Sequence, residues 1–181
     1  LESSGLLSAV SCFVVDDLNK RKLVHSLKQM NYIDSLTGLK NRNSYFKRLQ
    51  ELQKSQQALG VVYLDINGLK KANDTHGHTY GDSLITRASV LLTKIFKNDV
   101  YRIGGDEFVV ILKGSDFDNR VDLQMQFDNQ INENMSNGDV IVSSGMAVFD
   151  PEIDESYTEV FIRADKKMYE RKMALKALTA Q

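Results

Sequence analysis

Three acidic residues stand where their side chains could bind a divalent cation. Asp65 follows the apolar run 61–64, and Asp106 and Glu107 lie between two more apolar runs, 100–103 and 108–112. If these runs form neighbouring strands, carboxylates from two parts of the chain meet at one sheet edge. Such oxygens suit Mg²⁺, which takes one or two carboxylates and completes its octahedron with phosphates and water. Nucleotide chemistry is the natural use of this site, although each acid alone is also typical of a strand end or a solvated turn.

The apolar patterns predict the elements that carry these acids. The run 61–64 is continuous and β-branched, which favours a central strand covered on both faces. The two later runs flank Gly104 and Gly105, and they predict a β-hairpin whose turn is supplied by the glycines. The acids then lie at the tip of the hairpin.

Helices and one further strand are predicted around this core. A polar turn over 34–43 precedes a helix, and a second helix with a regular apolar stripe follows, capped by Asp82 and Ser83. Residues 116–135 alternate like a strand, but their length and Asn/Gln content favour a helix. Residues 140–149 predict a strand, followed by a final helix. This order predicts an α+β fold with a mixed, mainly antiparallel central sheet flanked by helices.

Composition limits the class of protein. Lysine plus arginine (23) nearly equals aspartate plus glutamate (24), so no global basic field exists to hold long nucleic acid. The single cysteine excludes an internal disulfide and fits a reducing compartment. The stretch 6–15 is shorter than the roughly 20 residues of a membrane helix and has no basic leader. We therefore expect a cytoplasmic piece without membrane contact, although the full-length protein could be membrane-tethered.

The first residues predict an appendage rather than part of the core. The apolar stretch 6–15 reads as a strand, and Leu23, Leu27 and Met30 follow it at helical spacing. Because the chain starts at Leu1, we expect a piece cut from something larger. Residues 1–17 are interpreted as the remnant of an upstream sensor domain, 18–33 as a linker helix, and 34–181 as the main domain.

Four ordered motifs resemble one family. The hairpin tip Gly104-Gly105-Asp106-Glu107-Phe108 matches the GGDEF signature. The segments 34–42, 65–82 and 164–172 resemble the opening motif, the nucleotide-binding stretch and the closing helix of the same family. The chain thus resembles GGDEF-domain diguanylate cyclases from residue 34 to residue 176. The resemblance implies a ferredoxin-like βαββαβ core similar to that of nucleotide cyclases.

The resemblance also implies roles for individual residues. The residues that would bind the metal, through carboxylates or a backbone carbonyl, are Asp65, Ile66, Asp106 and Glu107. The residues that would contact the phosphates through backbone N–H groups are Gly68, Leu69 and Lys70. The residues that would contact the guanine or the rest of the substrate site are Asn73, His78 and Asp82. The residues that would hold the triphosphate are Lys172 and Lys176. Catalysis would fall to Asp106 and Glu107.

The implied activity is the condensation of two GTP into cyclic di-GMP and two pyrophosphates. The cofactor would be Mg²⁺, with Mn²⁺ as an alternative. The active form would be a homodimer controlled by an upstream sensor domain. The sequence departs from the family at Lys176, where arginine is usual, and at Ile95 and Asn98, where many members carry an inhibitory product site. Two alternatives stay open: a catalytically inactive receptor for GTP or cyclic di-GMP, and a mononucleotide cyclase.

Overall fold

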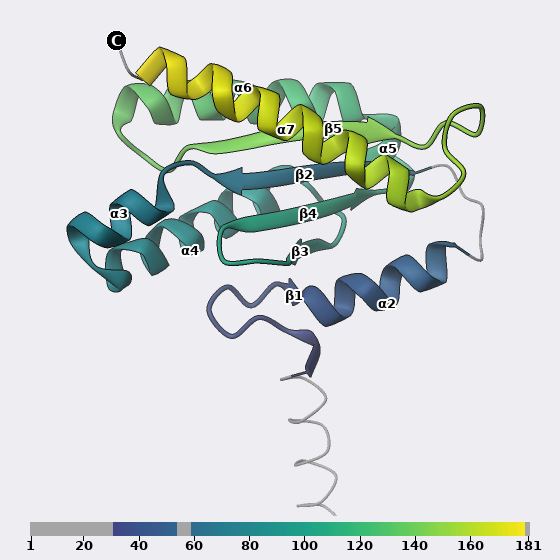
Figure 1. Ribbon diagram of the computed structural model, residues 1–181, viewed down its shortest axis with the longest axis horizontal. Coiled ribbons are helices and arrows are strands. Elements are labelled where there is room, and N and C mark those ends of the chain that lie inside the picture. The colour runs from purple at the N-terminus through teal and green to yellow at the C-terminus, as the bar shows by residue number, and fades with distance from the viewer. Residues whose placement is uncertain (1–30, 54–58, 180–181) are drawn as a thin grey trace, which may run out of the picture.

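The computed structural model describes residues 31–53 and 59–179. A five-stranded sheet in the order β1-β3-β4-β2-β5 forms its centre (Figure 1). The strands are β1 (Lys40–Asn41), β2 (Gly60–Ile66), β3 (Val100–Arg102), β4 (Glu107–Leu112) and β5 (Val142–Val148). The helices are α2 (Arg42–Leu52), α3 (Leu69–His76), α4 (His78–Ile95), α5 (Gly114–Asp118), α6 (Arg120–Asn137) and α7 (Tyr157–Thr179).

The predicted central strand is confirmed. β2 is hydrogen-bonded antiparallel to β4 on one side and to β5 on the other. β3 and β4 form the predicted antiparallel hairpin, while β1 pairs parallel with β3. The fold is therefore a mixed sheet flanked by helices, in the predicted α+β class.

Two cores cover the two faces of the sheet. Val62 and Leu64 of β2 are fully buried with residues of α4 and α6, whereas Val61 is buried with residues of α2 and α7. Figure 1 shows α7 crossing one face while α6 lies behind the sheet. Because side chains alternate along a strand, Tyr63 and Asp65 share the face of Val61 and lie on the side of α7.

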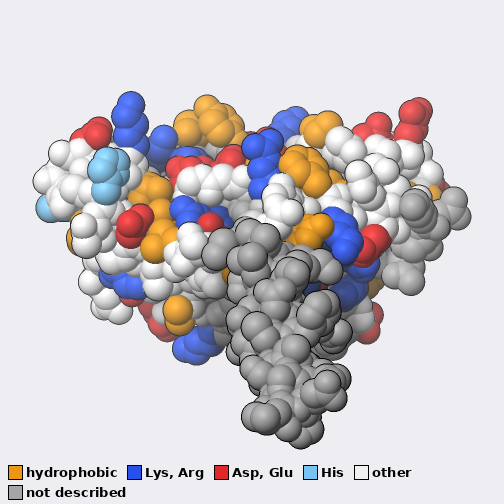
Figure 2. Space-filling model, turned by 90° about the horizontal axis from the view of Figure 1, so that it is seen from below, with side chains coloured by type: hydrophobic (Ala, Val, Ile, Leu, Met, Phe, Trp, Pro, Cys, Tyr) orange, Lys and Arg blue, Asp and Glu red, His pale blue; other side chains and the backbone are white. Residues whose placement is uncertain are grey.

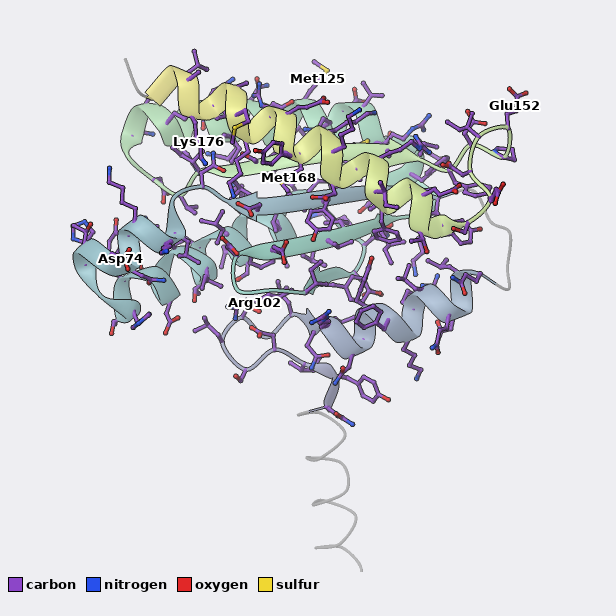
Figure 3. The ribbon with its side chains drawn as sticks, in the orientation of Figure 1. Asp74, Arg102, Met125, Glu152, Met168 and Lys176 are labelled. Atoms are coloured by element: carbon purple, nitrogen blue, oxygen red, sulfur yellow. The ribbon has the colours of Figure 1, made fainter. Side chains whose placement is uncertain are left out.

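α7 rests directly on β5 because one position there has no side chain. A Cβ on Gly145 would lie 2.1 Å from the carbonyl oxygen of Ala164 and 2.2 Å from the backbone nitrogen of Met168. Met168 is buried beneath the helix (Figure 3). This close approach sets the height of α7 above the sheet.

Side chains of α7 also cover the free edge of β5. Lys167 Nζ donates to the carbonyl of Met146 at 2.9 Å, and an Arg163 guanidinium nitrogen donates to the carbonyl of Val148 at 2.7 Å. Arg163 is held there by an ion pair with the buried carboxylate of Asp154.

The remaining expectations have mixed outcomes. The helix chosen for 116–135 is confirmed as α6, preceded by the short α5. The strand and the last helix are confirmed as β5 and α7. β1 and α3 were not predicted; β1 lies inside the expected polar turn. The sensor remnant 1–17, and the linker helix up to residue 30, lie outside the described residues.

The predicted cap of the second helix is wrong. α4 begins at His78 with Gly77 as its N-cap, so Asp82 and Ser83 lie inside the helix, and Ser83 Oγ donates to the Tyr80 carbonyl at 2.7 Å. Gly77 has a φ of 83°, which lets the chain reverse directly from α3 into α4. None of the helices in the described parts of the chain is long and apolar enough to cross a membrane.

Candidate functional site

The sheet brings two of the predicted acids directly opposite each other. Asp65 at the end of β2 pairs with Glu107 at the start of β4 in the antiparallel register, so both side chains leave the sheet on the same face. The backbone of the third acid is fixed nearby, because the Ile66 N–H donates to the Asp106 carbonyl at 3.0 Å. Carboxylates from the strand and the hairpin therefore meet at one end of β2.

Lys172 of α7 reaches down onto this acidic pair. Its ammonium forms an ion pair with Asp65 Oδ1. Burial raises the pKa of the Asp65 carboxyl, the Lys172 ammonium lowers it, and the charges of Asp106 and Glu107 raise it again. The net direction is upward, as expected where several carboxylates share a half-buried site. The Lys172 ammonium thus places a positive charge against Asp65, where the sequence predicts a metal ion.

Glu107 has a partner that the sequence analysis missed. The Tyr63 hydroxyl donates to Glu107 Oε1 at 3.1 Å. Burial, and then the charge of Glu107, raise the pKa of Tyr63, so the hydroxyl keeps its proton and remains a donor. The signal for this contact was the spacing of two residues between Tyr63 and Asp65, which puts both on one face of the strand.

An ion pair fixes the hairpin that carries the signature. Arg102 donates to both carboxylate oxygens of Asp34, at 3.0 and 3.2 Å, and to the carbonyl of Gly105 at 2.9 Å. Figure 3 shows Arg102, on β3, near the turn that precedes β1. Burial raises the pKa of Asp34, but hydrogen bonds from Thr37 and Arg102 outweigh it and hold that pKa below its ordinary value. The opening motif is therefore tied to the turn of the signature.

A glycine turn leads from β2 into α3. Gly68 has a left-handed φ of 73° and is the N-cap of α3, with no side-chain hydrogen bond capping the helix among the residues that the structure describes. The first N–H groups of a helix have no intrahelical partner and attract anions. The preceding residue is fixed, because Asn67 Oδ1 accepts from Ser143 Oγ at 2.7 Å. The amides at Leu69 and Lys70 thus begin a helix next to the acidic pair.

The two predicted guanine contacts lie on the helical hairpin of α3 and α4. Asn73 packs against Gly81, where a Cβ would be only 1.9 Å from Asn73 Oδ1. That oxygen is buried and has no hydrogen-bond partner in the described part of the chain. Asp82 follows Gly81 and is exposed, as is His78 at the start of α4. A buried acceptor without a partner is unusual, and a ligand donor would reach this oxygen only if the Asn73 side chain turned away from Gly81.

A hollow of about 300 Å³ lies on the other side of α3, between α3, α4 and the loop 138–141. Ile66 and Gly68 are the predicted site residues that line it, whereas Asn73, Asp82 and Lys172 do not. Lys176 lies one turn beyond Lys172 on α7 (Figure 3). On the face seen in Figure 2, basic and acidic side chains alternate, in keeping with the absence of a global basic field.

The donor set fits a divalent ion that is held jointly with a nucleotide. No group of three or more His, Cys, Asp or Glu side chains within residues 31–53 and 59–179 is arranged to hold a metal alone. Mg²⁺ does not need such a group, since it takes one or two protein carboxylates and fills its remaining positions with phosphate and water oxygens. The opposed Asp65 and Glu107 supply that number, and the Lys172 ammonium against Asp65 indicates that the position accepts a cation.

Solved structures with this fold are known. The coiled coil and GGDEF domain of DgcB from Caulobacter crescentus, in complex with c-di-GMP, has a TM-score of 0.78 with this chain. The two are 23% identical, and the match covers 93% of this chain and 95% of that one. At this identity the likeness supports the fold alone.

Sequence relatives cover different shares of the chain. The cyclic di-GMP phosphodiesterase PdeR of Escherichia coli (strain K12) is 35% identical over 104 residues, which are 55% of this chain and 16% of PdeR. An uncharacterized membrane protein of Staphylococcus aureus (strain USA300) is 29% identical over 176 residues, 91% of this chain and 49% of that protein. The chain thus spans less than half the length of both relatives.

The family profile described as "Diguanylate cyclase, GGDEF domain" matches residues 31–177. This range includes the acidic pair, the glycine turn, the helical hairpin and most of α7. Together with the shared fold, the match establishes that the chain belongs to the GGDEF-domain diguanylate cyclase family.

Proposed function

We propose that this chain is an active diguanylate cyclase domain, which condenses two GTP into cyclic di-GMP and two pyrophosphates. The observation that carries the proposal is the opposed pair of Asp65 and Glu107, with Lys172 against it and the uncapped start of α3 beside it. Carboxylates for a cation, an ammonium and helix N–H groups are the components that a triphosphate needs.

The neighbouring groups favour GTP as the substrate. The backbone N–H groups of Gly68, Leu69 and Lys70 would bind the phosphates, with Lys172 and Lys176 above them on α7. The exposed Asp82 carboxylate would accept from the guanine N1–H and N2–H groups, and Asn73 would form a further hydrogen bond with the same base. Adenine lacks that pair of donors, so we expect selection against ATP. His78 would contribute from the start of α4.

The reaction is a nucleotidyl transfer in which the chain mainly positions its substrates. The 3′ oxygen of one GTP forms a bond to the α-phosphorus of the other, the bond from that phosphorus to the β-phosphate bridging oxygen breaks, and pyrophosphate leaves with its electron pair. We assign the hydroxyl proton to a carboxylate oxygen of Asp106, beside Glu107. When bound by Asp65, Asp106, Glu107 and the Ile66 carbonyl, Mg²⁺, or Mn²⁺ in its place, supplies positive charge against the triphosphate. A second, identical transfer closes the ring.

The two-fold symmetry of the product favours a homodimer in which each subunit holds one GTP. Residues 1–17 and 18–33 would then be the end of a sensor domain and the helix that controls how two copies of 34–181 meet. We place the reaction in the cytoplasm, where GTP is available, whether or not the full-length protein is tethered to a membrane.

Product identity tests the proposal directly. The protein is incubated with GTP and Mg²⁺ at several protein concentrations, and products are identified by mass spectrometry. We expect cyclic di-GMP at a rate that rises more steeply than the protein concentration. Cyclic GMP would instead identify a mononucleotide cyclase. GTP binding without any product would identify a receptor and contradict the proposal.

Three variants locate the reaction. Asp106→Ala should abolish turnover while the fold is kept, whereas Asp118→Ala, an exposed aspartate of α5, should leave turnover unchanged. Asp82→Ala should reduce the preference for GTP over ATP. Retained activity in the first variant, or retained selectivity in the third, would contradict the corresponding role.

Product feedback should be weak in this protein. Ile95 is buried, and the side chain of Asn98 accepts from the Lys113 N–H at 2.7 Å, so neither position offers the charged pair of an inhibitory site. We therefore expect activity to be insensitive to added cyclic di-GMP beyond simple competition for the active site. Titration of the initial rate with product measures this, and strong noncompetitive inhibition would refute it.

A further inference from the structure

The carboxylates of Asp65 and Glu107 face each other across β2 and β4, and each has a different kind of partner. Like charges directly across an antiparallel pair destabilise it. Asp65 is balanced by the ammonium of Lys172. Glu107 instead receives a neutral donor, the hydroxyl of Tyr63, at 3.1 Å. A neutral donor orients a carboxylate without cancelling its charge, so Glu107 keeps its attraction for a cation.

The donor itself is rigidly held. Tyr63 lies in the middle of β2, between Val109 of β4 and Gly145 of β5 in the register. Its ring is half-buried and packs against the core that includes Tyr45, on the face covered by α7. Both ends of the hydrogen bond are therefore carried by paired strands and not by loops.

The second oxygen of Glu107 is located by a glycine. A Cβ on Gly104 would lie 2.3 Å from Glu107 Oε2, so this carboxylate oxygen occupies the space that a side chain at position 104 would fill. Oε1 is at Tyr63 and Oε2 is over Gly104. The two contacts together define one orientation of the carboxylate.

We propose that Tyr63 is a positioning residue, which holds the Glu107 carboxylate in the orientation that binds the divalent ion together with GTP. The inference deepens the proposed function and depends on it for the identity of the nucleotide. Groups that orient a metal-binding side chain have a large effect, since removing one typically costs about 10- to 100-fold in metal affinity or activity.

The test compares two tyrosines of the same core. Tyr63→Phe removes the hydroxyl that reaches Glu107, and Tyr45→Phe removes a hydroxyl from the neighbouring buried ring. Binding of Mn²⁺ is measured by electron paramagnetic resonance in the presence of a non-reactive GTP analogue. We expect the affinity to fall about tenfold or more in Tyr63→Phe and to stay unchanged in Tyr45→Phe. In turnover, the Mg²⁺ concentration for half-maximal activity should rise, while the KM for GTP at saturating Mg²⁺ stays near that of the parent.

A double-mutant cycle separates positioning from a general structural effect. In a Glu107→Gln background, Tyr63→Phe should cause no further loss of Mn²⁺ affinity if it acts through Glu107. The inference would be overturned if Tyr63→Phe bound Mn²⁺ within twofold of the parent affinity. It would also be overturned if Tyr63→Phe lowered the Mn²⁺ affinity as much in the Glu107→Gln background as in the parent. If Tyr63→Phe does not fold, Gly104→Ala tests whether the orientation of the Glu107 carboxylate matters, because the added Cβ would displace Oε2. Unchanged Mn²⁺ affinity in that variant would also overturn the inference.

The outcomes for the inference and for the proposed function are distinguishable. Cyclic di-GMP production by the parent, with Tyr63→Phe indistinguishable from Tyr45→Phe, would overturn the inference and leave the function standing. A parent that makes no product but shows the contrast in Mn²⁺ affinity would support the inference and contradict the cyclase activity.

Discussion

Gly145→Ala tests whether the contact between α7 and β5 controls the proposed active site. The added Cβ would lie 2.1 Å from the Ala164 oxygen and 2.2 Å from the Met168 nitrogen, both of them backbone atoms that no side-chain rotation can move. Ordinary contact begins near 3.4 Å, so α7 must rise by more than 1 Å. Lys172 lies one turn after Met168 and would rise with the helix, away from Asp65.

The expected effects follow from this displacement. Overpacking of a tight contact costs about 1 to 3 kcal/mol of unfolding free energy, which for a domain of this size lowers Tm by roughly 2 to 4 °C per kcal/mol. Misplacement of a catalytic group by about 1 Å can lower turnover about 100-fold. We therefore expect a folded variant whose kcat/KM falls much further than its stability.

Gly60→Ala is the matched control. It makes the same change on β2 beside β5, but the Cβ there would meet a movable methyl group of Leu112 at 3.3 Å. We expect its loss of stability to be smaller than that of Gly145→Ala and its activity to be unchanged. Urea unfolding and initial rates measure both variants. If Gly145→Ala matched the control in both measurements, the close backbone contact between α7 and β5 at Gly145 would be contradicted.

Three further changes have defined outcomes. Arg102→Met should lower the unfolding free energy by about 2 kcal/mol at pH 7. The pKa of Asp34 is held below 3.8, so the stability that its ion pair contributes is complete above that pH and is lost as the pH falls through the lowered value. The difference in unfolding free energy between variant and parent should therefore shrink at low pH. A difference that stays constant across pH in urea unfolding would refute this. Lys172→Met should weaken GTP binding about tenfold by calorimetry, unlike Lys166→Met at an exposed position of the same helix; equal affinities would contradict the phosphate role. Asp116→Ala should cost about 2 to 3 kcal/mol, because this buried carboxylate accepts from two backbone N–H groups at 2.7 and 2.8 Å; an unchanged urea midpoint would exclude that contribution.

The sheet was predictable from sequence because its strands carry strong local signals. β2 is continuous and apolar, and the glycines of the signature mark the hairpin. β1 was missed because it is two residues long and is defined only by its pairing with β3. α3 was missed because its sequence is polar and has one buried residue, Leu69.

The candidate site could be predicted only in part from such local sequence signals. Spacing put Asp65, Asp106 and Glu107 near one sheet edge, but it could not give the register that opposes Asp65 to Glu107. The hydrogen bond from Tyr63 and the seat of α7 on Gly145 depend on that register and on backbone contact between distant segments. The assigned binding roles remain predictions, since binding itself has to be measured.

The covered edge of β5 restricts how copies of this protein can associate. An outer strand normally offers a row of hydrogen-bonding groups to any passing chain. Here the carbonyls of Met146 and Val148 already accept from lysine and arginine side chains, and joining two sheets at this border would place those charges between them. We expect copies of the chain to meet through other surfaces, so that a high local concentration does not lead them to pair along β5 into a continuous sheet.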